Sequence, residues 1–125
     1  MSMVFKMRLK DGDVTVEIGK GIGNTLEKEL RDAKRRLWAI SPWVTEEYAG
    51  LLVRKSENGV NVRLTIKDRL TDFVHGKVYV VDSRAMIGSA NLTNAGMKRN
   101  SEALVVFDKA SIVGGIARMY EELEG

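Results

Sequence analysis

The amino-terminal part of the chain alternates between apolar and polar positions. Residues 3–9 place an apolar side chain at every second position, and residues 14–18 repeat this alternation. An Asp-Gly pair, Asp11-Gly12, separates the two runs, and such a pair between alternating segments is a strong signal for a tight turn. The pattern predicts a β-hairpin within residues 1–20, which either pairs with a sheet edge or covers a partner subunit.

Three later segments carry the periodicity of amphipathic helices. The first runs from residue 22 toward 37, with Asn24 as its predicted N-cap and Glu27 completing a capping box. The second begins at Thr45 and stops at Asn58-Gly59. The third covers residues 109–123. The predicted buried stripe of the first helix is Ile22, Leu26, Leu30, Ala33 and Leu37, and that of the third is Ile112, Ile116, Met119, Tyr120 and Leu123.

The basic residues of the first predicted helix fall outside its apolar stripe. They are Lys28, Arg31, Lys34, Arg35 and Arg36. This basic face is either solvated or contacts nucleic acid.

Short apolar runs between these helices predict the strands of a sheet. They lie at residues 37–40, 60–66, 78–81, 85–87 and 103–107. A strand, a helix and a strand follow one another before residue 67, which is the order of an α/β unit. The run at 78–81 is apolar on both faces, as in a central strand covered on both sides. We therefore expect one α/β domain over residues 1–125, with a hairpin at 1–20, a core at 22–125 and a mixed β-sheet flanked by helices.

Composition narrows the chemistry that the chain can perform. Cysteine is absent and histidine occurs once, so no disulfide, thiolate nucleophile or cysteine–zinc site is available. We expect no metal and no cofactor. No run of about 18 apolar residues occurs, so we expect a soluble, cytoplasmic protein without a membrane partner.

The net charge is small, at +3, but the charged residues are unevenly distributed along the chain. Residues 63–100 hold seven Lys and Arg against three Asp, whereas residues 101–125 hold two basic side chains against five acidic ones. This distribution favours an anionic partner near the middle of the chain. A solvated charged surface is the alternative.

The single histidine, His75, lies two residues before Lys77 at the head of the central strand. Alternation places both side chains on one face, roughly 6–7 Å apart. An imidazole and an ammonium side by side are suited to a phosphate, because one attacks or donates a proton while the other neutralises oxygen charge. This pair is our principal candidate for a catalytic centre.

The residues around this pair form a longer pattern: His75-x-Lys77-x4-Asp82, then Gly88-Ser89-x-Asn91, then Asn100-Ser101-Glu102. This pattern resembles the signature of the phospholipase D superfamily, and in particular its small metal-independent nucleases with one motif per chain. Between Asp82 and Gly88 the chain has five residues, one fewer than the family usually has. A tight hairpin at Asp82-Ser83-Arg84 would accommodate this difference. The resemblance implies a phospholipase D/nuclease-like fold.

The resemblance also implies roles for individual residues. His75 would attack phosphorus to form a phosphohistidine, and Lys77, Asn91 and Ser89 would hold the phosphate oxygens. Glu102 would orient an imidazole. Asp82 is expected to be structural, at the turn or beside a basic residue, and Gly88 to permit close backbone approach.

One histidine cannot serve as nucleophile and as leaving-group acid at the same moment. A two-fold dimer resolves this, because an isologous interface brings the same motif twice to the axis. We therefore expect a homodimeric nuclease with a shared active site, acting on DNA or RNA.

Three residues outside the motif are further candidates for substrate binding. Trp43 follows a predicted strand and would stack on a base, or else would be a core or dimer contact. Lys98 and Arg99 would contact phosphates along the nucleic-acid backbone, or else would be ordinary surface residues.

Two other functions remain as alternatives to a nuclease. One is a non-catalytic nucleic-acid-binding module, or a nuclease domain excerpted from a larger helicase or restriction protein. The other is a phospholipase D-type lipid phosphodiesterase, for which the sequence offers no visible apolar entry helix.

Overall fold

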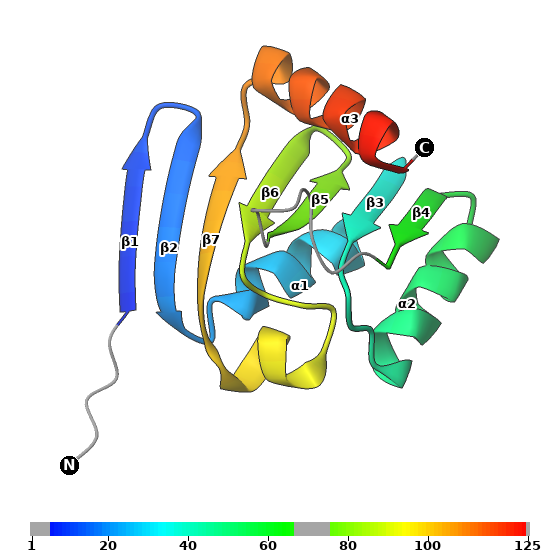
Figure 1. The fold of residues 1–125 in the computed structure, drawn as a ribbon, viewed down its shortest axis with the longest axis horizontal. Coiled ribbons are helices and arrows are strands. Elements are labelled where there is room, and N and C mark those ends of the chain that lie inside the picture. The colour runs from blue at the N-terminus through cyan, green and yellow to red at the C-terminus, as the bar shows by residue number, and fades with distance from the viewer. Residues whose placement is uncertain (1–5, 67–75, 125) are drawn as a thin grey trace.

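The computed structural model describes residues 6–66 and 76–124. Seven strands form one sheet in the order β1-β2-β7-β6-β5-β3-β4 (Figure 1). The elements are β1 (Lys6–Asp11), β2 (Val14–Lys20), α1 (Gly23–Asp32), β3 (Arg36–Ile40), α2 (Glu46–Glu57), β4 (Asn61–Thr65), β5 (Lys77–Val81), β6 (Arg84–Gly88), the π-helical turn η1 (Ala95–Arg99), β7 (Ser101–Phe107) and α3 (Ala110–Glu124). Among these strands only β3 and β4 pair in parallel, so the predicted mixed sheet is confirmed.

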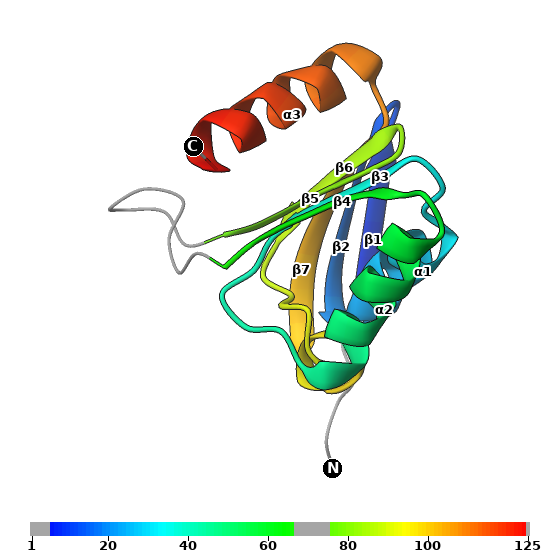
Figure 2. The ribbon, with the colours of Figure 1, turned by 90° about the vertical axis from the view of Figure 1, so that its right-hand side faces the viewer.

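Helices cover both faces of the sheet, with α1 and α2 on one side and α3 on the other (Figure 2). The alternation of strand side chains supplies two separate cores. Tyr79 and Val81 of β5 face α1 and α2, whereas Val78 and Val80 belong to the cluster beneath α3. The predicted central strand, covered on both faces, is confirmed. None of the described helices has the length and apolar character needed to cross a bilayer.

The predicted amino-terminal hairpin is confirmed, and it lies at the edge of the sheet. β1 pairs with β2 and β2 pairs with β7, so β1 is the outermost strand. Gly12 occupies the turn with φ +56°, a conformation that glycine adopts without steric cost. The hairpin therefore extends the sheet of its own chain.

The first helix differs from its prediction at both ends. α1 begins at Gly23 after Ile22, and Asn24 makes no side-chain cap. It ends at Asp32, so Leu37 does not extend the helix stripe but belongs to β3, as the predicted strand at 37–40 requires. The stop comes from outside the segment, because the backbone N–H groups of residues 34–36 bind the carboxylate of Asp82.

The carboxyl-terminal helix is confirmed, and its inward face matches the prediction at four of five positions: Tyr120 is buried, and Ile116, Met119 and Leu123 are partly buried against the same cluster. Ile112 is 37% exposed, whereas Val113, Ala117 and Tyr120 are buried. These three residues are spaced by four and three positions, so they form one stripe. The stripe packs on β5 and β6.

Candidate functional site

The described site residues gather at one end of three adjacent strands. Lys77 begins β5 and lies opposite Gly88, the last residue of β6, while Gly88 lies opposite Leu104 of β7. Neighbouring strands are about 4.8 Å apart. The same end of these strands therefore carries Lys77, the segment after Gly88 and the start of β7. We call this end of the strands the candidate catalytic edge.

Ser89 and Glu102 are joined directly across this edge. The Ser89 hydroxyl donates a hydrogen bond to Oε2 of Glu102 and accepts one from the backbone N–H of Ala103 at 2.9 Å. Nδ2 of Asn100 donates to Oε1 of the same carboxylate at 3.3 Å. Both carboxylate oxygens of Glu102 thus have partners that fix its orientation.

Asn91 is held by Ser41, the residue directly after β3, which the sequence pattern did not single out. The buried Ser41 hydroxyl lies 3.4 Å from Oδ1 of Asn91 and 2.8 Å from the carbonyl oxygen of Trp43, and it accepts the N–H of Leu92 at 3.2 Å. Ser41 therefore ties the end of β3 to the segment that carries Asn91. The sequence around Ser41 indicated only that a strand stops before Pro42.

Tyr79 supports the same segment from below and was also missed. Its hydroxyl donates a hydrogen bond to the carbonyl oxygen of Ala90 at 2.5 Å. Burial raises the pKa of Tyr79 well above its ordinary value, a hydrogen bond with Ser41 opposes this rise, and the charge of Glu102 adds to it. The phenol is therefore a neutral donor that fixes the backbone between Ser89 and Asn91.

Two glycines allow the backbone to pack tightly here. A Cβ at Gly88 would overlap the carbonyl oxygen of Ala103, and a Cβ at Gly96 would lie 2.6 Å from the carbonyl oxygen of Asn91. The close approach at Gly88 agrees with its predicted role. Gly96 was missed, because the residue that it approaches belongs to a turn whose shape the sequence does not define.

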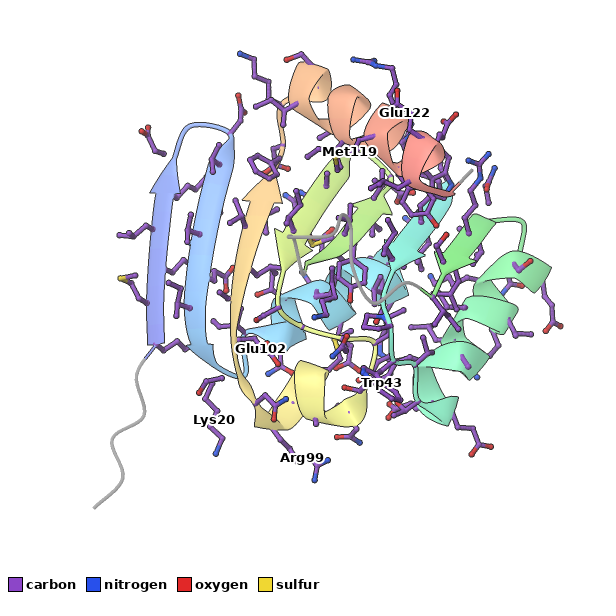
Figure 3. The ribbon with its side chains drawn as sticks, viewed as in Figure 1. Lys20, Trp43, Arg99, Glu102, Met119 and Glu122 are labelled. Carbon is purple, nitrogen blue, oxygen red and sulfur yellow. The ribbon has the colours of Figure 1, made fainter. Side chains whose placement is uncertain are left out.

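Trp43 lies beside the Asn91 segment with 69% of its surface exposed. Val44 forms a bridge with Leu92, and the N–H of Thr45 donates to the carbonyl oxygen of Leu92 at 3.0 Å. Figure 3 shows Trp43, Arg99 and Glu102 along one end of the molecule. The exposed indole is not a core residue.

The two basic residues of η1 differ in their surroundings. Nζ of Lys98 lies 3.6 Å from a carboxylate oxygen of Glu47 and 4.0 Å from one of Glu27. Arg99 is exposed, and within the described chain its guanidinium has no carboxylate partner. Arg99 is therefore the better placed of the two for a phosphate.

Asp82 lies at the opposite end of β5, in the turn that joins β5 to β6. Its carboxylate accepts hydrogen bonds from the N–H groups of Lys34, Arg35 and Arg36 at 2.7–3.0 Å. Burial raises the pKa of Asp82, but these three donors outweigh it and hold the pKa below its usual value. Asp82 adopts φ +51° in a tight turn at the predicted position, and its contacts are those of a structural residue.

His75, the predicted nucleophile, lies outside the described residues. Within residues 6–66 and 76–124, no three His, Cys, Asp or Glu side chains cluster closely enough to hold a metal ion. The described part of the site thus contains an ammonium, a hydroxyl bound to a carboxylate, and an amide.

Residues 41–123 match the family described as cardiolipin synthase, PLD-like domain. No curated protein sequence matches the chain significantly.

Among solved structures, Nuc from Salmonella typhimurium, a phospholipase D family member, is 19% identical with a TM-score of 0.67, and the match covers 87% of this chain and 93% of Nuc. NucT from Helicobacter pylori is 12% identical with a TM-score of 0.64, covering 88% and 94%. The archaeal chromatin protein TrmBL2, which binds DNA, is 14% identical with a TM-score of 0.58, covering 86% and 50%. At these identities the likeness is one of fold.

Proposed function

The chain belongs to the PLD-like domain family of cardiolipin synthase, within the phospholipase D superfamily, and we propose that it is a metal-independent phosphodiesterase. We further propose that it acts as a homodimeric nuclease on DNA or RNA. The observation that carries the proposal is the meeting of Lys77, the Ser89–Glu102 pair and Asn91 at one sheet edge.

These groups supply what a phosphodiester requires in place of a metal ion. The Lys77 ammonium neutralises charge on a phosphate oxygen, and the donor end of the Asn91 amide hydrogen-bonds to another. Oδ1 of Asn91 faces Ser41, so the amide nitrogen is the end that serves the substrate. Because the Asn91 amide is held by the buried Ser41, it needs little rearrangement when a phosphate binds.

In the proposed reaction, an imidazole nitrogen of His75 attacks phosphorus. A nitrogen–phosphorus bond forms as the bond from phosphorus to the leaving ester oxygen breaks, and His75 of the partner subunit gives that oxygen a proton. Water then attacks the phosphohistidine and gives a proton to His75 of the partner subunit as the nitrogen–phosphorus bond breaks, which releases a phosphate monoester and restores both histidines. Glu102 acts as a positioning residue, because it holds Ser89 and orients an imidazole.

Nucleic acid is the favoured substrate because of the groups around the site. The exposed Trp43 indole offers a flat surface on which a base stacks, and Arg99 offers a cation near the same edge. The family's description names a lipid enzyme, so phospholipid is the second candidate. Turnover of phosphatidylcholine vesicles faster than of an oligonucleotide would select it.

The test is hydrolysis of bis(p-nitrophenyl) phosphate and of a single-stranded oligonucleotide in excess EDTA. We expect wild-type turnover to persist, and to fall at least about a thousandfold in His75→Ala and about a hundredfold in Lys77→Ala. Lys10→Ala, an exposed lysine on β1, is the charge-matched control and should remain active. Activity that vanishes with EDTA and returns with Mg²⁺, or binding without turnover, would contradict the proposal.

A further inference from the structure

The end of the sheet opposite the candidate site contains two neighbouring cavities of about 520 and 370 Å³. The larger is lined by Arg35, Arg36 and Trp38, together with Ala110 and Gly114 of α3. The smaller lies between the connection that follows α1 and the end of α2. Its charged lining residues are Lys34, Arg54 and Lys55.

The connection between α1 and β3 separates the two cavities, and Asp82 determines its shape. Because three successive N–H groups of this connection bind one carboxylate, the backbone is fixed. Lys34 then lines one cavity while Arg35 lines the other. Asp82 is the only acidic residue lining either cavity in the described chain. Its carboxylate is already engaged by those N–H groups.

The walls of the cavities are held by further contacts. The guanidinium of Arg36 lies 5.1 Å from the centre of the Trp38 ring, and its Nε donates to the carbonyl oxygen of Asp82 at 3.0 Å. Lys55 donates to the carbonyl oxygens of Arg31 and Ala33 at the end of α1. Arg35 and Arg54 are exposed, and neither forms an ion pair within 4 Å with a described carboxylate. These two side chains are therefore available to an external anion.

This basic surface is remote from the candidate catalytic edge. β5 begins with Lys77 at that edge and ends beside Asp82, so its five residues separate the two regions by roughly 16 Å. Figure 2 shows the C-terminal end of α2 and the start of β3 at one end of the strands, away from the start of β5. One phosphate cannot reach both regions, whereas a chain of several nucleotides can.

We propose that Arg35 and Arg54, with the cations around them, form a second binding surface for the phosphodiester backbone of a nucleic acid. The basic side chains that line the two cavities are spread out instead of converging on one point. They are Arg35 and Arg36 in the larger cavity and Lys34, Arg54 and Lys55 in the smaller one. This arrangement fits a polymer with repeated negative charges better than a small anion. Each phosphate contact displaces counterions, so binding through this surface depends on salt.

The test compares two double variants with the same loss of charge. Arg35→Ala/Arg54→Ala removes one cation from each cavity. The backbone N–H of residue 35 is retained, so its hydrogen bond to Asp82 is kept. Lys10→Ala/Lys28→Ala removes two exposed lysines that line neither cavity. A fluorescent single-stranded 40-mer serves as the probe, with its Kd measured over a range of salt concentrations. Unfolding midpoints confirm that both variants are folded.

We expect the arginine variant to weaken binding on the order of tenfold, and to reduce the slope of log K against log salt by about 1.4, as for two single-strand phosphate contacts. The lysine variant should stay near wild type. Equal weakening in both variants, no weakening in either, or weaker binding to anionic vesicles with unchanged binding to the 40-mer would overturn the inference. Hydrolysis of bis(p-nitrophenyl) phosphate should be unchanged in the arginine variant. If the wild type hydrolyses no phosphodiester, the proposed function fails, and the binding result still decides this inference.

Discussion

The hydroxyl of Ser89 donates a hydrogen bond to the carboxylate of Glu102, thirteen residues later in the chain. The bond crosses from the end of β6 to the start of β7, and the backbone supports it, since the N–H of Ser89 donates to the carbonyl oxygen of Ala103 at 3.0 Å. Two parts of the sequence pattern, Gly-Ser-x-Asn and Asn-Ser-Glu, are thereby one structural unit.

Glu102→Gln tests the role of this unit in catalysis. The substitution keeps the shape of the side chain but removes its charge, so it weakens the charge-assisted bond to Ser89. We expect kcat to fall roughly a hundredfold with little change in unfolding temperature, because Glu102 is only half-buried. Glu57→Gln, at the exposed end of α2, is the control and should leave both values unchanged. Wild-type kcat in Glu102→Gln would show that the carboxylate has no part in the reaction.

Ser41→Ala tests the support of Asn91 from β3. The substitution leaves the buried N–H of Leu92 and the partly buried carbonyl oxygen of Trp43 without their partner. We expect the free energy of unfolding to fall by about 1–3 kcal/mol, together with a lower kcat. Denaturant unfolding and steady-state kinetics measure the two effects. Ser56→Ala, on the exposed face of α2, should change neither, and equal behaviour of the two variants would refute the role of Ser41.

Gly88→Ala tests the close approach of β6 and β7. A Cβ there overlaps a backbone oxygen of Ala103, so one strand must shift. We expect a loss of roughly 1–3 kcal/mol in unfolding free energy and loss of hydrolysis, because Ser89 follows directly. In α3, Gly114→Ala meets only the flexible end of Arg118 at 3.6 Å, and helix propensity predicts a gain of up to about 1 kcal/mol. A stable, active Gly88→Ala protein would be incompatible with this packing.

Asp82→Asn tests the link between the turn and the connection after α1. Asparagine tolerates the positive φ of Asp82, so the change removes charge without straining the backbone. We expect about 1–3 kcal/mol of destabilisation near pH 7, from weaker bonds to three N–H groups. The folded pKa of Asp82 lies below its ordinary value, so this stabilisation is complete above about pH 4 and is lost as pH falls through the folded pKa.

Denaturant unfolding of wild type and Asp82→Asn between pH 2 and pH 7 measures this dependence. The difference between the two proteins should narrow on the acid side of pH 4. A difference that stays constant with pH would show that the charge of Asp82 does not act through those N–H groups.

The sequence predicted best what depends on neighbours along the chain. The strand at 78–81 and the hairpin around Gly12 follow from alternation and turn chemistry. Lys77, Ser89 and Glu102 were selected because their spacing forms a pattern, and the structure places them at the same end of adjacent strands. Ser41 and Tyr79 were missed because their partners, Asn91 and Ala90, lie far from them in sequence. A serine or tyrosine within or beside an apolar run does not indicate which distant residue its hydroxyl binds.

The same limit explains the error in the first helix. The spacing of Ile22, Leu26, Leu30, Ala33 and Leu37 fits a helix, and local periodicity alone would extend it. The carboxylate of Asp82 binds the N–H groups of residues 34–36 from nearly fifty residues away, and this tertiary contact decides where the helix ends. Arg35 and Arg36, predicted to lie on a helix face, consequently line a cavity.

Mixing wild type with a large excess of His75→Ala tests whether a working site requires His75 from two chains. After chain exchange, the hydrolysis of bis(p-nitrophenyl) phosphate is measured per wild-type chain. We expect this rate to fall in proportion to the wild-type fraction, because nearly every wild-type chain then has a partner without the histidine. A rate per wild-type chain that stays constant at every mixing ratio, with exchange confirmed by mass, would contradict it.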